Sequence, residues 1–103
     1  MRTSLTLTLA VLASPVLAPL ASAAPPQVVT DIPPVHALVA SVMGDLGTPV
    51  LLLDKGANAH SFQLRPSQAA ALSRAGLLVW VGPEMTPWLS RALDGLGGDT
   101  PRL

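Results

Sequence analysis

Three short apolar segments alternate with three helical patterns along the chain, and this alternation limits the fold more than any other feature. The expected strands are residues 27–30, 50–53 and 77–81. Val50 to Leu53 is apolar at every position, which is typical of a strand buried on both faces of a parallel sheet. Strands that alternate with helices favour right-handed crossovers in a parallel sheet. The sequence therefore predicts an α/β fold in the order β-α-β-α-β-α.

Each expected helix carries start signals. The first follows the turn at residues 31–34 and repeats apolar side chains at helical spacing, at Val35, Leu38, Val39, Val42 and Leu46. The second opens at residues 65–67, and the third opens at Thr86, a candidate N-cap, with Pro87 in its first turn. We expect no closing strand after the third helix. Three short strands cover a core poorly, so the pattern predicts part of a larger α/β domain.

The first residues have the pattern of an export signal. Arg2 precedes an uncharged stretch, Leu5 to Leu20, and the small residues Ala21-Ser22-Ala23. This order predicts a signal peptide at residues 1–23 and a mature segment at residues 24–103. A membrane anchor is disfavoured, because the stretch is shorter than the roughly 20 residues that span a bilayer and contains two prolines. Without a cysteine there is no site for a lipid anchor, so we expect an exported, periplasmic protein.

Composition excludes several classes of function. The absence of cysteine excludes disulfides, thiolate metal sites and cysteine nucleophiles. Lys and Arg together number 6, and so do Asp and Glu. Nucleic-acid-binding proteins usually carry a basic excess, so we expect no nucleic-acid partner. No phosphate-binding loop, dinucleotide fingerprint or nucleophile elbow is present.

The loop at residues 54–64 is the main candidate for a functional site. Ligands of open parallel sheets bind outside the carboxyl ends of the strands, and this is the longest loop that leaves such an end. It contains His60, whose imidazole is a good zinc ligand. His36 lies on the first helix, where a surface or capping role is expected, and Trp80 and Trp88 are expected to pack in the interior. A lone loop histidine also fits a solvent-exposed residue, and the residues alone leave both interpretations open.

Two runs of residues resemble the zinc-uptake solute-binding proteins of ABC transporters, within the cluster A-I metal-binding family. One run is Gly56-Ala57-x-x-His60-x-Phe62-x-Leu64-Arg65-Pro66-Ser67, and the other is Leu78-Val79-Trp80-Val81-Gly82-Pro83-Glu84-Met85. The resemblance extends from about Val28 to Leu96. It implies two α/β lobes, joined by a long helix, with zinc bound in the cleft between them.

The resemblance also implies the site and the partners. His60 corresponds to the first metal ligand, and later histidines, with a carboxylate or water in some members, complete the site. Asp54, Arg65 and Glu84 are expected to support it from nearby positions. The implied cargo is Zn²⁺, with Mn²⁺ as the alternative. The implied partner is a membrane permease, and a monomeric binding protein rather than an enzyme is expected.

Two departures from the family pattern affect the expected site. Ala59 and Ser61, on either side of His60, stand where relatives often have acidic residues. We also expect the chain to be an N-terminal portion that lacks the second lobe and the linking helix, so that alone it is not a high-affinity receptor. Three alternatives stay open: a manganese-binding member of the same family, a periplasmic α/β hydrolase fragment with His60 as base and Ser61 or Ser67 as nucleophile, and an inert interaction fragment.

Overall fold

The computed structural model describes residues 18–19, 23–96 and 99–103. The expected signal peptide therefore lies almost entirely outside the described residues. Within the described ranges, no helix is both long and apolar enough to cross a bilayer. The elements are β1 (Val28–Thr30), α1 (Pro33–Met43), the short 3-10 helix η1 (Gly44–Leu46), β2 (Val50–Leu51), α2 (Pro66–Ser73), β3 (Leu77–Val79) and α3 (Pro87–Gly95).

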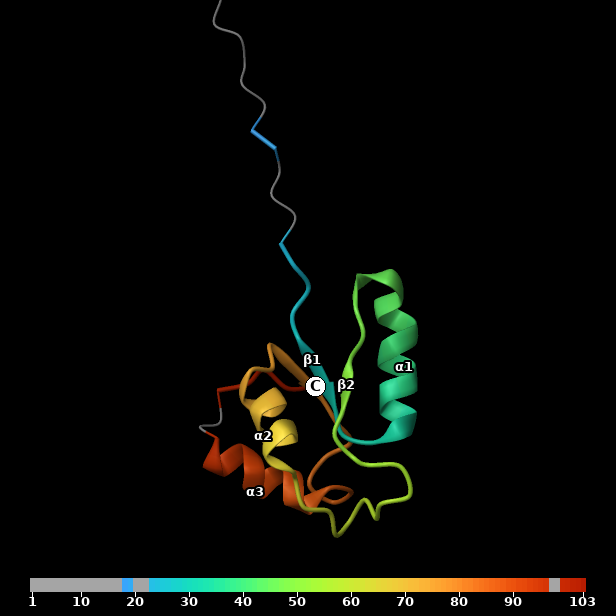
Figure 1. The fold of residues 1–103 in the computed structure, drawn as a ribbon, viewed down its shortest axis with the longest axis vertical. Coiled ribbons are helices and arrows are strands. Elements are labelled where there is room, and N and C mark those ends of the chain that lie inside the picture. Colours follow the sequence, from blue (N-terminus) through green and yellow to red (C-terminus); the bar gives the residue numbers. More distant parts are fainter. Residues whose placement is uncertain (1–17, 20–22, 97–98) are drawn as a thin grey trace, which may run out of the picture.

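The strands form one parallel sheet in the order β2-β1-β3, which confirms the predicted α/β class. Val29 of β1 is the Cα partner of Val50 on one side and of Leu78 on the other. The chain moves from β1 to β2 in one direction and from β2 across β1 to β3 in the other. Right-handed crossovers then put the connecting helices on opposite faces. Figure 1 shows this arrangement, with α1 on one side of the sheet and α2 and α3 on the other.

No strand follows α3 among the described residues, as expected, but the C-terminal segment still pairs with the edge of the sheet. Arg102 forms a parallel bridge with Leu78 of β3. The Leu78 and Trp80 amides donate to the Pro101 and Leu103 carbonyls, at 2.8 and 3.0 Å, and the Leu103 amide donates to the Leu78 carbonyl at 2.9 Å. The segment at 101–103 is too short to show a strand pattern, and it becomes extended because β3 offers it an unpaired edge.

Proline begins each of the three α-helices in the described part of the chain, at Pro33, Pro66 and Pro87. The first helical position suits proline, because the amide it lacks would have no partner within the helix. The expected helix starts are therefore confirmed. Thr86 is the N-cap residue of α3, as expected, but its hydroxyl caps no α3 amide. It lies instead within hydrogen-bond distance of the Asp31 carboxylate and the Gly82 carbonyl.

The hydrophobic core lies between the sheet and the pair α2 and α3. Side chains alternate across a strand, so Val29 and Leu78 point to this face of the sheet. They are fully buried with the other members of the core, Leu52, Leu53, Leu72, Trp88, Leu89 and Leu93. No residue of α1 is buried.

The apolar stripe of α1 is where the structure differs from the expected buried face. Leu38 is 70% exposed and Val42 is 86% exposed. The helix contacts β1 and β2 but leaves the β3 side of its face of the sheet uncovered. A hollow of about 310 Å³ remains there, lined only by apolar residues: Val28, Leu38, Val39, Val42, Met43, Leu77, Val79 and Leu103. The helical spacing of apolar residues thus predicted a helix with an apolar face, but it did not indicate what covers that face.

Candidate metal-binding loop

Three loops gather at one edge of the sheet because the strands run parallel. Residues 31–32 follow β1, residues 54–65 lead from the β2 strand towards α2, and residues 80–86 follow β3. This carboxyl edge is where ligands of open parallel sheets bind. The structure therefore confirms the topology that placed His60 at a candidate ligand-binding edge.

His60 lies exposed in a short turn that its own neighbours hold. The Asn58 side-chain oxygen accepts a hydrogen bond from the His60 amide at 2.8 Å, and the Asn58 carbonyl accepts one from the Ser61 amide at 3.3 Å. Asparagine commonly forms such a bond to the backbone two residues further on. The turn holds the backbone at His60, and the residue itself is exposed to solvent.

The two ends of the loop are joined by an ion pair. Both guanidinium nitrogens of Arg65 that face Asp54 donate to its carboxylate, each at 3.0 Å. The pair is solvent-exposed, with 62% of the Arg65 side chain and 39% of the Asp54 side chain accessible, so its contribution to stability is at most about 1 kcal/mol. Its two-pronged geometry nevertheless fixes how the ends of the loop meet.

Gln68, which is buried, connects this ion pair to the protein interior. Its side-chain nitrogen donates to the Leu52 carbonyl at 2.8 Å and to Asp54 at 3.2 Å. Its side-chain oxygen accepts from the Arg65 amide at 2.7 Å, which satisfies a backbone donor at the start of α2. The sequence analysis did not single out Gln68. Its position three residues after the N-cap is the signal that could have found it.

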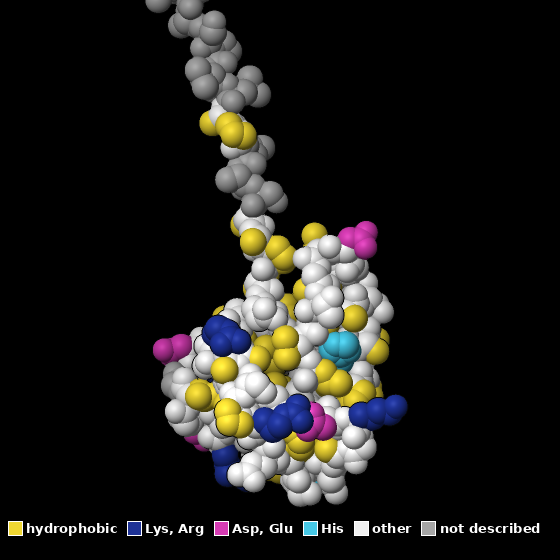
Figure 2. All heavy atoms as spheres, in the orientation of Figure 1, with side chains coloured by type: hydrophobic (Ala, Val, Ile, Leu, Met, Phe, Trp, Pro, Cys, Tyr) yellow, Lys and Arg dark blue, Asp and Glu magenta, His cyan; other side chains and the backbone are white. Residues whose placement is uncertain are grey.

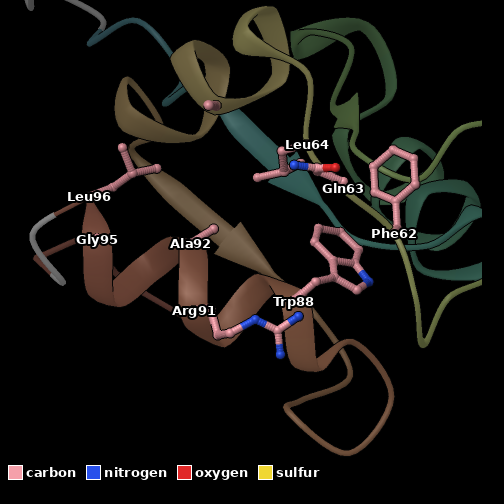
Figure 3. A pocket seen from close by; sticks show the side chains of 9 residues that line it. Phe62, Gln63, Leu64, Trp88, Arg91, Ala92, Gly95 and Leu96 are labelled. Atoms are coloured by element: carbon pink, nitrogen blue, oxygen red, sulfur yellow. The ribbon is translucent and has the colours of Figure 1, made fainter.

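Trp88 of α3 contacts the middle of the loop at two residues. Its indole N–H donates to the Ala59 carbonyl at 2.6 Å, and its ring meets the Phe62 ring edge-on, with centroids 5.2 Å apart. Figure 3 shows the two rings side by side at one end of a hollow of about 630 Å³, which α3 and residues 62–64 line. Trp88 is buried in the core, as expected, but its hydrogen bond to the loop could not be inferred from a partner 29 positions away.

Asp31 is a second residue that the sequence analysis did not identify. It is fully buried at the end of β1. One carboxylate oxygen accepts from the Ile32 amide at 2.8 Å, and the other accepts from the Val81 amide at 3.0 Å and lies 3.4 Å from the Thr86 hydroxyl. Asp31 thereby holds the loops after β1 and β3 together. An acid that follows a buried strand is a weak signal for such a role, because the donors lie far along the chain.

The other two candidates occupy different places. The His36 ring nitrogen Nε2 donates to the Pro49 carbonyl at 3.1 Å, so this histidine ties α1 to the start of β2. Glu84 is exposed on the turn after β3, where its carboxylate lies against Gly82. Among the described residues, Glu84 makes no hydrogen bond or ion pair with the His60 loop. The structure brings Asp54 and Arg65 together and leaves Glu84 apart from them.

The described ranges hold no group of three or more His, Asp or Glu side chains placed to bind one metal ion. His60 is the open imidazole in this part of the protein, and a tetrahedral zinc site needs three further donors. Figure 2 shows charged side chains of both signs scattered over the visible face, rather than gathered into one patch.

Comparison with known proteins identifies relatives over nearly the whole described segment. The family model described as zinc-uptake complex component A, periplasmic, matches residues 28–102. The high-affinity zinc uptake system protein ZnuA of Paracoccus denitrificans is 59% identical over 78 residues, which are 76% of this chain and 24% of that protein. ZnuA of Yersinia pestis is 49% identical over 75 residues, 72% of this chain and 22% of that protein. The chain thus spans about a quarter of the length of these curated relatives.

Solved structures share the fold. The periplasmic zinc binding protein TroA from Treponema pallidum superposes with a TM-score of 0.67 at 19% identity, over 76% of this chain and 28% of that one. The metal-dependent lipoprotein YcdH from Bacillus subtilis superposes with a TM-score of 0.66 at 24% identity, over 75% of this chain and 29% of that one. These neighbours confirm the expected α/β fold of metal-binding solute-binding proteins.

Proposed function

Because the chain belongs to the family of periplasmic zinc-uptake component A proteins, we propose that it is part of a protein that captures zinc and passes it to the permease of an ABC importer. The Paracoccus denitrificans relative is a high-affinity zinc uptake protein. Since this chain spans 24% of that relative, high affinity and delivery to the permease are properties of the longer protein.

His60 is the proposed zinc ligand of this segment. The observation that carries the proposal is an exposed imidazole in a held turn at the carboxyl edge of a parallel sheet, inside the region that the family matches. A neutral imidazole binds zinc well and is a poor ligand for the oxygen-preferring Mg²⁺ and Ca²⁺. With one such donor, the chain binds zinc weakly, and the remaining donors belong to the rest of the longer protein.

Asp54, Arg65 and Glu84 have proposed supporting roles. The Asp54–Arg65 pair closes the loop that carries His60, which supports a role in holding its shape. For Glu84, the support is its position on the loop that follows β3, at the same edge of the sheet. Its carboxylate adds negative charge at that edge, which favours a cation there.

Zinc is proposed as the cargo over manganese. Imidazole binds Zn²⁺ more strongly than Mn²⁺, whereas manganese prefers sites rich in carboxylate oxygens. In the described residues, no acidic side chains join His60 to form a cluster of three potential ligands. The donor available here therefore favours zinc.

We propose binding rather than catalysis. A hydrolase with His60 as base needs a nucleophile within hydrogen-bond reach. In the part of the chain that the structure describes, neither Ser61 nor Ser67 hydrogen-bonds the His60 ring. The proposed location is the periplasm, after removal of residues 1–23 and without a lipid anchor, and the proposed mature segment, residues 24–103, acts as a monomer with no nucleic-acid partner.

The test is calorimetric titration of the chain with zinc chloride, comparing His60→Ala with His36→Ala. The second variant is the matched control, since the His36 ring nitrogen Nε2 is bonded to the Pro49 carbonyl. We expect weak binding by the parent chain, loss of that binding in His60→Ala and retention in His36→Ala. Equal binding by both variants, or loss in His36→Ala alone, contradicts the assignment of His60.

A further inference from the structure

The Trp88 side chain of α3 contacts the loop on both sides of His60. Ala59 precedes His60, and its carbonyl accepts the Trp88 indole N–H at 2.6 Å. Phe62 follows His60 by two positions, and its ring meets the Trp88 ring at an interplanar angle of 69°. Figure 3 shows the Phe62 ring beside the indole. The exposed histidine thus lies between two points that one tryptophan holds.

Trp88 is held in place by the hydrophobic core. It is only 4% exposed, and it belongs to the same buried cluster as Leu89 and Leu93 of its own helix. Ala59 and Phe62 are partly buried and pack against that cluster, whereas His60 between them is exposed. The loop is therefore held by the core on either side of the two exposed residues His60 and Ser61.

We propose that Trp88 is a positioning residue for metal capture by His60. The inference rests on the proposed function, because it presupposes that His60 binds zinc. Ordering a flexible loop costs conformational entropy at the moment of binding, and a loop that is already ordered avoids that cost. The indole N–H supplies this order directly, since it is bonded to the carbonyl of the residue next to the ligand.

Trp80 provides a matched control. It is a partly buried tryptophan that packs against the core cluster to which Trp88 belongs. Among the described residues, its indole makes no hydrogen bond to the loop at 54–65. A role in packing alone predicts that Trp88→Phe, like Trp80→Phe, leaves the order of the loop unchanged, whereas a positioning role predicts that only the variant at Trp88 affects the loop.

The experiment uses the full chain, labelled with ¹⁵N, in the parent form and as Trp88→Phe and Trp80→Phe. A further form carries 3-benzothienylalanine at position 88, which keeps the bicyclic ring and replaces the N–H with sulfur. Amide hydrogen exchange at His60 and Ser61 reports the order of the loop. Titration with zinc chloride, followed through the His60 resonances, gives the dissociation constant.

We expect both changes at Trp88 to accelerate exchange at the two amides and to raise the zinc dissociation constant about three- to tenfold, the range for one lost hydrogen bond. Trp80→Phe is expected to change both quantities less than about twofold, in line with a variant that touches no loop contact. Because the benzothienyl form retains the packing, its behaviour separates the hydrogen bond from the fit of the ring in the core.

Two results overturn different parts of the account. If the parent chain shows a zinc response at His60 and the forms changed at Trp88 match Trp80→Phe in affinity and exchange, the positioning role of Trp88 is wrong and the proposed function stands. If the parent chain shows no zinc response at His60, the proposed function fails, and the metal role of Trp88 fails with it.

Discussion

At the scale of single residues, the carboxyl edge of the sheet is organised by buried polar groups rather than by the exposed ones. Asp31 is fully buried, and its two carboxylate oxygens accept the Ile32 and Val81 amides. These bonds connect the end of β1 to the end of β3, whereas the His60 loop follows β2, on the other side of β1. Two of the three loops at the carboxyl edge are therefore held together by one buried carboxylate.

Asp31→Asn tests this dependence. The amide has one acceptor oxygen where the carboxylate has two, so its NH₂ group meets a backbone N–H and one buried donor loses its partner. We expect the free energy of unfolding to fall by about 1–3 kcal/mol. Urea denaturation measures the change, with Asp45→Asn as control, because Asp45 is exposed in η1. Equal unfolding midpoints for the two variants would refute the structural role of Asp31.

Sequence patterns predict single residues unevenly. His60 could be selected because it lies in the longest loop after a predicted strand and within a recognisable motif. The roles of Asp31 and Trp88 could not, because their partners Val81 and Ala59 are 50 and 29 positions away. Such contacts form only when the sheet has brought α3 and its preceding loop beside the strands.

At the scale of elements, α1 differs from the other two α-helices of the described chain. The helices α2 and α3 bury side chains against the sheet, whereas α1 buries none. Parallel sheets are usually covered on both faces. The apolar stripe at Leu38 and Val42 is therefore surface in this structure, and it adds little to the stability of the fold here.

The double variant Leu38→Gln/Val42→Gln tests the element-scale account. These side chains are 70% and 86% exposed. We expect the free energy of unfolding to change by no more than about 0.5 kcal/mol and the binding of a hydrophobic dye to decrease. As the comparison, Leu89→Ala in the core of α3 should cost about 2–5 kcal/mol. A loss in the double variant as large as that in Leu89→Ala would show that the stripe is buried in solution.

The order of the elements was predictable for local reasons, and the pairing of the C-terminal segment with the sheet was not. Proline marks the first position of α1, α2 and α3, and apolar runs mark β1, β2 and β3. The pairing of residues 101–103 with β3 has no such local mark. Its cause is the free edge of the sheet, which exists only in the assembled fold.

At the scale of the whole molecule, the described segment is an α/β scaffold that presents the loop for which we propose metal binding. Its fold matches that of metal-binding solute-binding proteins, and it spans about a quarter of the length of its zinc-uptake relatives. The loop is closed by Asp54 and Arg65 and braced by Trp88. One imidazole on a loop that is already ordered is consistent with part of a zinc site, which needs further donors.

Export is the second property of the whole molecule. On expression in a Gram-negative bacterium, we expect the chain in the periplasmic fraction with Ala24 as its first residue, because signal peptidase requires small residues before the cut. Mass spectrometry of the fractionated protein measures this directly. Ala23→Leu serves as the control and should leave the chain uncleaved. An uncut parent chain in the cytoplasm would contradict the assignment of residues 1–23.

His60 is the proposed zinc ligand of this scaffold. The most direct measurement is the ¹⁵N chemical shift of the histidine ring nitrogens during titration of the chain with zinc chloride. We predict that a ring nitrogen of His60 moves by many parts per million, while the His36 ring, whose Nε2 is bonded to Pro49, does not. A shift at His36 instead, or none at His60 at saturating zinc, would contradict the claim.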